Sequence, residues 1–311
     1  MQKYDGAKLA GRLTGGGLVL CLATLLGAAG GSPSSTTFSG RRAFENLKWI
    51  VALGPRPSGS AALAKTRVEI QRQLKQAGLT VEEDAFTAST PLGQVAMTNL
   101  IAPIPGEQRK IVILAGHYET KRFDDIHFLG ANDGGSSTAI LLEMGRVLAK
   151  RKNKFTYWLV FFDGEEAFVQ FSATDGLYGS RHLVQKLAAR GELNRIQAMI
   201  VLDMVADAKL NIYRDYNSTA WLAEKVFAVA RRLGYGRYFR DEPRAYEDDH
   251  IPFVKAGVSA VDLLDFDYGP NNRYWHSAQD TLDKCSPTSL AIVGRVVLAT
   301  LEELEKSERL P

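Results

Sequence analysis

Histidine and acidic residues recur in this chain at one kind of position, beside short apolar runs and glycine turns. They stand in the segments Gly116-His117-Tyr118-Glu119, Asn132-Asp133-Gly134, Asp163-Gly164-Glu165-Glu166, Leu202-Asp203 and Trp275-His276. Taken singly, each has a structural explanation, since acidic residues often cap helices or form turns. Taken together, carboxylates gathered in one place raise one another's pKa unless a cation neutralises them. Because imidazole nitrogen and carboxylate oxygen are ligands of zinc, the set predicts a zinc site.

The adjacent pair Glu165-Glu166 can divide two tasks between neighbouring carboxylates. If Glu166 binds the metal, Glu165 projects beside it and is free to carry a proton next to a carbonyl that the metal polarises. Phe161, Phe162 and Phe168 flank the pair. Their apolar surroundings should limit solvent and raise the pKa of Glu165 toward neutral pH. We therefore expect Glu165 to act as a base and not as a ligand.

The elements that must position these residues alternate along the chain. Continuous apolar runs at 110–115, 155–162, 198–205 and 258–266 are typical of strands buried on both faces. Further strands are expected at 81–86 and 95–101. Helical spacing covers residues 61–77, 136–148, 178–189, 219–233 and 288–304. The alternation predicts an α/β fold, a three-layer α/β/α sandwich around a mostly parallel mixed sheet. Ligands of such folds bind beyond the carboxyl ends of the strands.

The start of the chain has the composition of a targeting segment. Basic residues Lys3, Lys8 and Arg12 precede a short apolar stretch at 17–26, and small residues follow it. This pattern predicts a signal peptide over residues 1–31 and an exported, periplasmic or secreted protein. The alternative is an uncleaved N-terminal anchor, which would be the protein's only membrane contact. Residues 32–40 are expected to form a flexible linker and residues 41–308 a single catalytic domain.

Composition sets further bounds on what the chain can be. Of its 311 residues, 45% are hydrophobic and 23% are charged, as in ordinary soluble domains. The net charge is +3. Part of this charge comes from the leader, which contains three basic residues and one acidic residue. The remainder is nearly neutral, so we expect no nucleic-acid partner. Separately, we expect a monomer. Cys21 lies in the leader, which leaves Cys285 without an intramolecular disulfide partner.

In their order along the chain, these residues resemble the zinc aminopeptidase family that also contains the glutaminyl cyclases. The resemblance rests on His117, Asp133, Glu165-Glu166, Asp203 and His276, and it covers nearly all of the chain after the leader. Within the family, the cyclase branch is favoured by three segments and by the tryptophan that precedes His276. The segments are residues 161–168, 175–183 and 248–253, and the tryptophan is Trp275.

The cyclase pattern implies a role for each matching residue. Asp133, Glu166 and His276 would bind a single zinc ion. Glu165 would be the general acid and base, and Asp203 and Asp248 would assist it as hydrogen-bonded carboxylates. The substrate pocket would be lined by Trp275, by Phe171 where animal cyclases have tryptophan, and by Glu247 where they have glutamine.

The activity that this resemblance implies is cyclisation of an N-terminal glutamine on a peptide or protein. The substrate's own α-amine would attack the side-chain carbonyl and release ammonia, leaving pyroglutamate. The zinc would polarise that carbonyl, and Glu165 would carry the proton.

Two other interpretations remain open. In the aminopeptidase pattern His117 and Asp203 bind a second zinc ion, Asp133 bridges the two ions, and the enzyme hydrolyses N-terminal residues. Aminopeptidases of this family usually have aspartate where this chain has Glu119, and the longer side chain should disturb the orientation of His117. This departure favours one ion, although two are possible. The third interpretation is a catalytically silent relative that binds peptides, but no ligand is missing.

Overall fold

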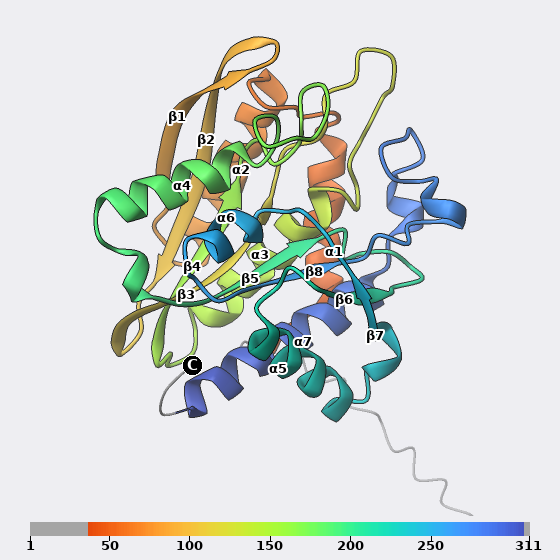
Figure 1. The fold of residues 1–311 in the computed structure, drawn as a ribbon. Coiled ribbons are helices and arrows are strands. Elements are labelled where there is room, and N and C mark those ends of the chain that lie inside the picture. Colours follow the sequence, from red (N-terminus) through yellow and green to blue (C-terminus); the bar gives the residue numbers. More distant parts are fainter. Residues whose placement is uncertain (1–36, 308–311) are drawn as a thin grey trace, which may run out of the picture. The chain divides into compact units, whose positions relative to one another are not determined.

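The computed structural model describes residues 37–307, so the predicted leader at 1–31 lies outside the described residues. The described part belongs to one compact unit. Its centre is a six-stranded sheet in the order β1-β2-β4-β3-β5-β8 (Figure 1). The strands are β1 Glu82–Thr90, β2 Gly93–Ile104, β3 Gln108–His117, β4 Phe155–Phe162, β5 Ile196–Asp203 and β8 Ala260–Leu264. Strands β4, β3, β5 and β8 run parallel, whereas β1 and β2 are antiparallel additions at one edge.

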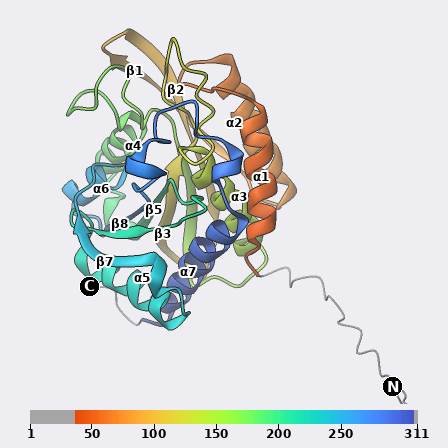
Figure 2. The ribbon, with the colours of Figure 1, turned by 90° about the vertical axis from the view of Figure 1, so that its right-hand side faces the viewer.

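Helices cover both faces of this sheet. One face carries α1 Gly40–Ala52, α2 Ala61–Gln76, α3 Gly135–Leu148, α5 Ala220–Arg232 and α7 Pro287–Lys306, which share the larger apolar core. The other face carries α4 Tyr178–Ala189 and α6 His250–Lys255 over a second core. Figure 2 shows α4 and α6 on one side of the strands, and α1 and α3 on the other. The predicted three-layer sandwich with a mostly parallel mixed sheet is therefore confirmed.

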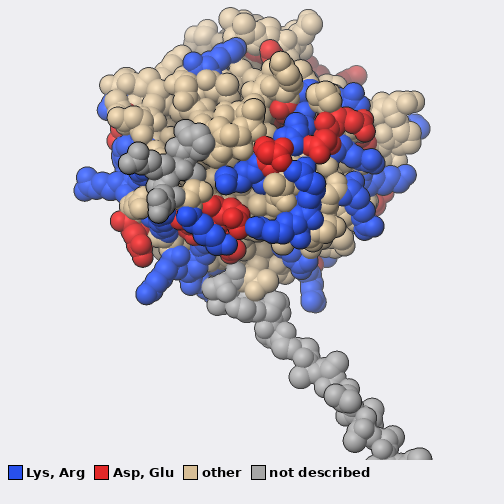
Figure 3. Space-filling model, turned by 60° about the horizontal axis from the view of Figure 1, so that its bottom comes forward, with Lys and Arg blue, Asp and Glu red and all other residues tan. Residues whose placement is uncertain are grey.

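Short elements complete the described chain. Two parallel strands, β6 Ile212–Asp215 and β7 Phe239–Arg244, form a small separate sheet. The 3-10 turns are Leu193–Arg195, Gly236–Tyr238, Pro270–Asn272 and Leu282–Lys284. On the face drawn in Figure 3, basic and acidic side chains interleave. Among the ion pairs of the described chain, Arg214 and Arg231 both pair with Glu224 and Asp241.

The domain begins earlier than residue 41, where the sequence placed its start. Phe38 is buried, and its ring occupies the space that a side chain at Gly294 of α7 would need. The Ser39 side chain accepts a hydrogen bond from the Arg42 backbone and caps α1. A residue so capped and packed is fixed by the fold. The last three residues of the expected 32–40 linker therefore belong to the folded domain, and residues 32–36 lie outside the described residues.

None of the helices in the described part of the chain combines the length and the hydrophobicity needed to cross a membrane.

Candidate active site

Functional side chains collect where the central strands end. His117 is the last residue of β3, Asp203 is the last residue of β5, and Glu165-Glu166 follow β4 after a short turn. Asp133 lies in the turn that leads into α3. Because the three strands are parallel, their carboxyl ends meet at the same edge of the sheet. His276 reaches this edge from the loop beyond β8, where its backbone is left-handed (φ 50°).

Three of these side chains form a first ligand set. The His276 Nε2 atom lies 2.8 Å from Glu166 Oε1 and 3.3 Å from Asp133 Oδ2. Asp133 and Glu166 are both buried. Their ligand atoms all lie within 4.8 Å of one another, which suits one small cation with nitrogen and oxygen ligands. The structure thus brings together the three residues that the cyclase pattern implies as zinc ligands.

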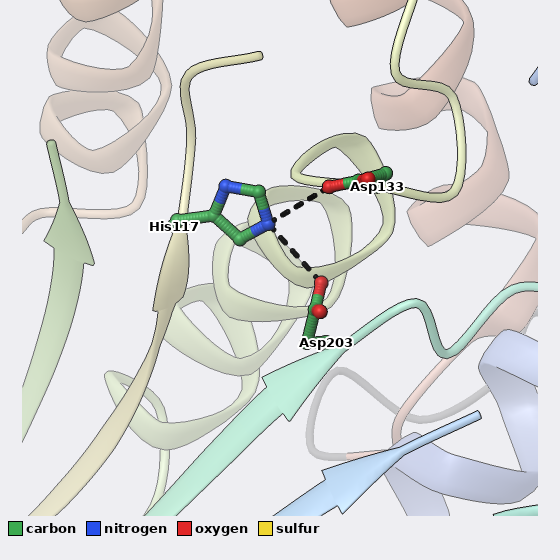
Figure 4. A group of neighbouring side chains, drawn as sticks. All are labelled: His117, Asp133 and Asp203. Carbon is green, nitrogen blue, oxygen red and sulfur yellow. Dashed lines mark hydrogen bonds and ion pairs between the residues drawn. The ribbon is translucent and has the colours of Figure 1, made fainter. Parts of the chain in front are cut away.

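A second set shares Asp133 with the first. The His117 Nε2 atom lies 3.2 Å from Asp133 Oδ1 and 3.1 Å from Asp203 Oδ1. Figure 4 shows the His117 ring directed between the two carboxylates, which come from the turn before α3 and from the end of β5. The arrangement has the form of the second site in the aminopeptidase pattern. The geometry is therefore compatible with a cation at either ligand set.

The turn that carries Asp133 is held by a buried carboxylate that the sequence did not single out. Asp280 accepts hydrogen bonds from the backbone nitrogens of Asn132 (2.8 Å) and Asp133 (3.1 Å). The next residue, Gly134, has φ 75°, and a Cβ there would lie 2.3 Å from the Glu119 carbonyl oxygen. Glycine is required at this point because other residues rarely adopt this conformation and none would fit.

Glu119 is buried behind the turn that carries Glu165 and Glu166, which we call the double-glutamate turn. Its Oε1 atom accepts hydrogen bonds from the backbone nitrogens of Glu165 (2.7 Å) and Glu166 (3.2 Å). The same oxygen lies 3.6 Å from His117 Nδ1, too far for a hydrogen bond. Within the described residues His117 Nδ1 has no hydrogen-bond partner. The carboxylate of Glu119 therefore accepts hydrogen bonds from the double-glutamate turn and does not orient the His117 ring.

Charge at the site is unbalanced toward the acidic side. Burial, reinforced by Glu166, raises the pKa of Glu165 well above its ordinary value. Burial also raises the pKa of Asp203 to about 7, although His117 opposes this shift. Burial lowers the pKa of His276, but Glu166 and Asp133 outweigh it and raise the value to about 9. Carboxylates that repel each other and histidines held in their charged form by them both indicate a site that binds a cation.

Asp133 itself is a further sign that this site binds a cation. Its Oδ2 atom is buried and has no hydrogen-bond partner within the described chain. Its ion-pair contact with His276 Nε2 is 3.3 Å long, and a buried carboxylate oxygen that accepts no hydrogen bond is costly unless a cation meets it. The donor set therefore fits a zinc ion held by Asp133, Glu166 and His276.

These residues open onto a cavity of about 540 Å³. The predicted pocket residues Trp275, Phe171 and Glu247 all line it, as does Asp248. The Trp275 ring stacks on His276 at a centroid distance of 3.9 Å, and it is 38% exposed. Its outer face is therefore available to a substrate.

The sequence interpretation missed several residues of this cavity. Tyr246, Leu264 and Phe266 contribute to its walls. Lys121 also lines it, with its Nζ atom 3.6 Å from Glu166 Oε2 and donating to the Ala167 carbonyl at 2.7 Å. Lysine two residues after Glu119 was a visible signal, since a cation near clustered carboxylates lowers their repulsion.

The remaining histidines lie away from this site. His182 Nε2 contacts Asp84 Oδ1 at 3.2 Å, and His250 Nε2 contacts Asp215 Oδ2 at 3.0 Å. His127 is exposed, and the described residues place it in no group that could hold a metal ion.

Comparison with known proteins gives a consistent set of relatives. The model of peptidase family M28 matches residues 99–301. Glutaminyl-peptide cyclotransferase of Boiga irregularis is 31% identical over 295 residues, covering 81% of this chain and 79% of that protein. The Drosophila melanogaster glutaminyl-peptide cyclotransferase is 29% identical, covering 78% and 76%.

Solved structures agree with this result. The glutaminyl cyclase of an Acidobacteriales bacterium superposes with a TM-score of 0.84 at 42% identity, covering 89% of this chain and 98% of that one. The Porphyromonas gingivalis glutaminyl cyclase gives a TM-score of 0.78 at 28% identity, covering 86% and 99%. A leucine aminopeptidase precursor of Bacteroides thetaiotaomicron shares the fold at 23% identity, with a TM-score of 0.78 and coverage of 88% and 98%.

Proposed function

This chain belongs to peptidase family M28, and we propose that within the family it is a glutaminyl-peptide cyclotransferase. The relatives favour this function over the aminopeptidase alternative. The observation that carries the proposal is the position of Glu165, which lines the cavity beside the Asp133, Glu166 and His276 ligand set without belonging to it. The substrates are peptides or proteins that begin with glutamine.

The metal of this enzyme is zinc, and the nitrogen and oxygen donors of Asp133, Glu166 and His276 would hold it. When bound, zinc withdraws electron density from an amide carbonyl oxygen and stabilises negative charge there. We propose one ion. His117 lacks the hydrogen bond at Nδ1 that usually orients a metal-binding histidine, which disfavours a second ion on its other nitrogen.

Glu165 carries the proton of the reaction. The α-amine of the substrate has an ordinary pKa near 7.7–8.0, so a carboxylate with a raised pKa can take its proton at little cost. The amine nitrogen then bonds to the side-chain carbonyl carbon, and the bond from that carbon to the amide nitrogen breaks. Glu165 returns this proton to the amide nitrogen, which leaves as ammonia, and the ring nitrogen releases its remaining extra proton to water, so that neutral pyroglutamate is left. Both reacting groups belong to one residue, so the attack is intramolecular.

Two further carboxylates assist, and the cavity walls position the substrate. Asp203 and Asp248 both line the cavity and can accept hydrogen bonds from the amide nitrogen as it gains protons. Trp275 and Phe171 are each 38% exposed and provide aromatic surface for the glutamine side chain and the residue after it. Glu247 lies at the exposed edge of the cavity, where it can attract the substrate's ammonium group before deprotonation.

The protein acts outside the cytoplasm under this proposal. The basic and apolar pattern of residues 1–31 supports export with removal of the leader, or anchoring if the leader is retained. Sequencing the N-terminus of protein from the exported fraction tests this point. A start near residue 32 supports cleavage, whereas an intact leader in the membrane fraction supports an anchor. We propose a monomer, which the mass measured by light scattering tests.

The activity itself is tested with paired peptides. The purified domain is incubated with a peptide that begins with glutamine and with the same peptide beginning with leucine, and products are followed by mass spectrometry. We expect the glutamine peptide to lose one ammonia and the leucine peptide to remain unchanged. Release of a free amino acid from either peptide would establish the aminopeptidase alternative. No turnover by protein that contains stoichiometric zinc would establish the silent alternative.

A further inference from the structure

His117 has a second face that neither ligand set described above uses. Its Nε2 atom is directed at Asp133 and Asp203, and its Nδ1 atom points the opposite way along the ring, toward Glu119. The His117 side chain is 1% exposed and Glu119 is fully buried. Within the described chain, neither His117 Nδ1 nor Glu119 Oε2 has a hydrogen-bond partner. Two buried polar atoms are thus left unsatisfied, although burial without a partner is costly.

Glu119 is fixed in a way that leaves one oxygen free. Its Oε1 atom receives the two backbone hydrogen bonds from Glu165 and Glu166. These bonds restrain the carboxylate without using Oε2. A carboxylate that is held by one oxygen is preorganised to offer the other as a ligand.

Glu165 completes the arrangement from the cavity side. One ligand atom each from His117, Glu119 and Glu165 lies within 4.8 Å of the others. Donors at about 2.0–2.2 Å from a tetrahedral zinc are roughly 3.3–3.6 Å apart. His117 Nδ1 lies 3.6 Å from Glu119 Oε1, which places the carboxylate that carries the free Oε2 atom beside this nitrogen. Binding requires the Glu165 carboxylate, which lies within 4.8 Å of the other two ligands, to close to this spacing, and water from the cavity can provide a fourth ligand.

We propose that His117 Nδ1, Glu119 and Glu165 form a separate site for a divalent cation such as zinc, and that a cation bound there inhibits the enzyme. The site would keep Nε2–H of His117 on its two carboxylates, because a neutral imidazole that binds a metal through one nitrogen carries its proton on the other. It is therefore compatible with a single zinc ion on Asp133, Glu166 and His276. The glutamate at position 119 provides a free oxygen while its other oxygen holds the double-glutamate turn.

The inhibitory effect rests on the proposed function, whereas cation binding does not. A carboxylate that binds a divalent cation is no longer free to accept a proton from the substrate amine. If Glu165 is the proton carrier, the enzyme loses activity when this site fills. Binding itself requires only the three side chains and is measured without substrate.

Equilibrium dialysis of the zinc-loaded enzyme against increasing zinc chloride tests the site, with bound metal measured by elemental analysis. The wild-type protein should bind one zinc ion beyond the tightly held one. Glu119→Gln should weaken this additional ion by about tenfold or more, and the exposed control Glu107→Gln should leave it unchanged. Asp203→Asn removes a carboxylate from the other face of His117 and should leave the additional ion within about threefold.

The same measurement can overturn the proposal. If no additional ion binds, the proposed site does not exist. If Asp203→Asn abolishes binding of the additional ion while Glu119→Gln retains it, the ion binds on the Nε2 side of His117 and the proposal is wrong. Should Glu119→Gln fail to fold by circular dichroism, Glu165→Gln provides the same test from the cavity side.

Initial rates of the cyclisation assay, measured over the same zinc range, separate the two proposals. We expect inhibition to follow the occupancy of the additional ion and to require about tenfold more zinc in Glu119→Gln. Binding without inhibition would overturn the proposed role of Glu165 and the inhibition, and leave the cation site standing.

Discussion

Two regions of this protein bring histidine and acidic side chains together inside the fold, and they differ in how the charge is balanced. Between β1 and α4, the single buried carboxylate of Asp84 meets three donors. Its Oδ1 atom accepts from Lys186 Nζ at 2.6 Å and contacts His182 Nε2 at 3.2 Å, and Oδ2 accepts from Asn99 at 3.1 Å. Every oxygen of this carboxylate has a partner from the chain itself. The charge of Asp84 is therefore balanced by side chains of the protein, without a bound cation.

At the ends of β3, β4 and β5 the balance is reversed. Six carboxylates surround two histidines and one lysine; they are Glu119, Asp133, Glu165, Glu166, Asp203 and Asp248. Within the described residues, the Oδ2 atoms of Asp133 and Asp248 have no hydrogen-bond partner. The comparison shows that a buried histidine and acid pair is not by itself a functional sign. An excess of buried carboxylate over available donors is one, because a bound cation must balance it.

The largest effect is expected when the metal ligand shared by both sets is neutralised. Asp133→Asn removes one charged ligand and leaves Glu166 and His276 unable to hold the ion tightly. Metal provides several kcal/mol of stabilisation to developing charge, so turnover should fall by about 10³-fold or more. Elemental analysis should show loss of zinc from the purified variant. A variant that keeps both its zinc and its activity would contradict the ligand assignment.

The next effect separates the two adjacent glutamates. Glu165→Gln should lower kcat by about 10²–10⁴-fold, since a positioned acid and base contributes that much. The content of tightly held zinc, measured after dialysis against zinc-free buffer, should stay at the wild-type value because Glu165 is not a ligand of that ion. Elemental analysis and steady-state kinetics on the same preparation check both parts. Loss of zinc in Glu165→Gln would show that the roles of the two glutamates are not divided in this way.

The balanced cluster should respond in stability and not in activity. Burial raises the pKa of Asp84, but hydrogen bonds from Lys186 and Asn99 outweigh burial and hold the pKa below its ordinary value. Asp84→Asn leaves those donors poorly paired and should lower the free energy of unfolding by about 1–3 kcal/mol at neutral pH. Because the folded pKa is lowered, the stabilisation is present above the unfolded pKa, about 3.9, and is lost as pH falls through the folded value.

Urea unfolding of the wild type and of Asp84→Asn at pH 7 and below pH 4 measures this difference. The two stabilities should converge at the lower pH. Zinc content and turnover of Asp84→Asn at pH 7 should match the wild type, and the exposed change Asp241→Asn serves as a control. A loss of turnover comparable to that of Glu165→Gln would show that the two regions are not independent.

Much of the architecture follows from periodicity. Residues 155–162 and 178–189 were predicted with the bounds that β4 and α4 have, because continuous apolar runs and helical spacing are local patterns. The carboxyl ends of parallel strands meet by necessity. The predicted ligands therefore lie together although 159 residues separate His117 from His276 (276 − 117). The small sheet of β6 and β7 was not predicted, since β7 is polar and exposed along most of its length.

The residues that support the site could not be predicted in the same way. Asp280 holds the Asp133 turn across 147 residues, and Glu119 reaches the backbone of Glu165 across 46 residues. In both cases a side-chain carboxylate accepts a hydrogen bond from a loop backbone nitrogen, and no periodic pattern in the sequence specifies the path of a loop. Phe38 was assigned to the linker because the glycine and serine residues around it suggest flexibility, whereas its burial depends on the gap at Gly294 of α7.

The smallest effect is expected at the cavity wall, where neither charge nor metal is involved. Phe171 is 38% exposed in the cavity, so it gives a substrate apolar surface and no charge. Phe171→Ala should cost about 1 kcal/mol of substrate binding, which raises KM roughly fivefold. Because the lost contact is made equally before and during the reaction, kcat should change little. Steady-state kinetics with one glutamine peptide measures both constants, and Leu92→Ala, an exposed change outside the cavity, is the matched control. A fall in kcat without a rise in KM would mean that the aromatic wall orients Glu165 or the metal ligands. Phe171 would then act on the charged site and not only on substrate binding.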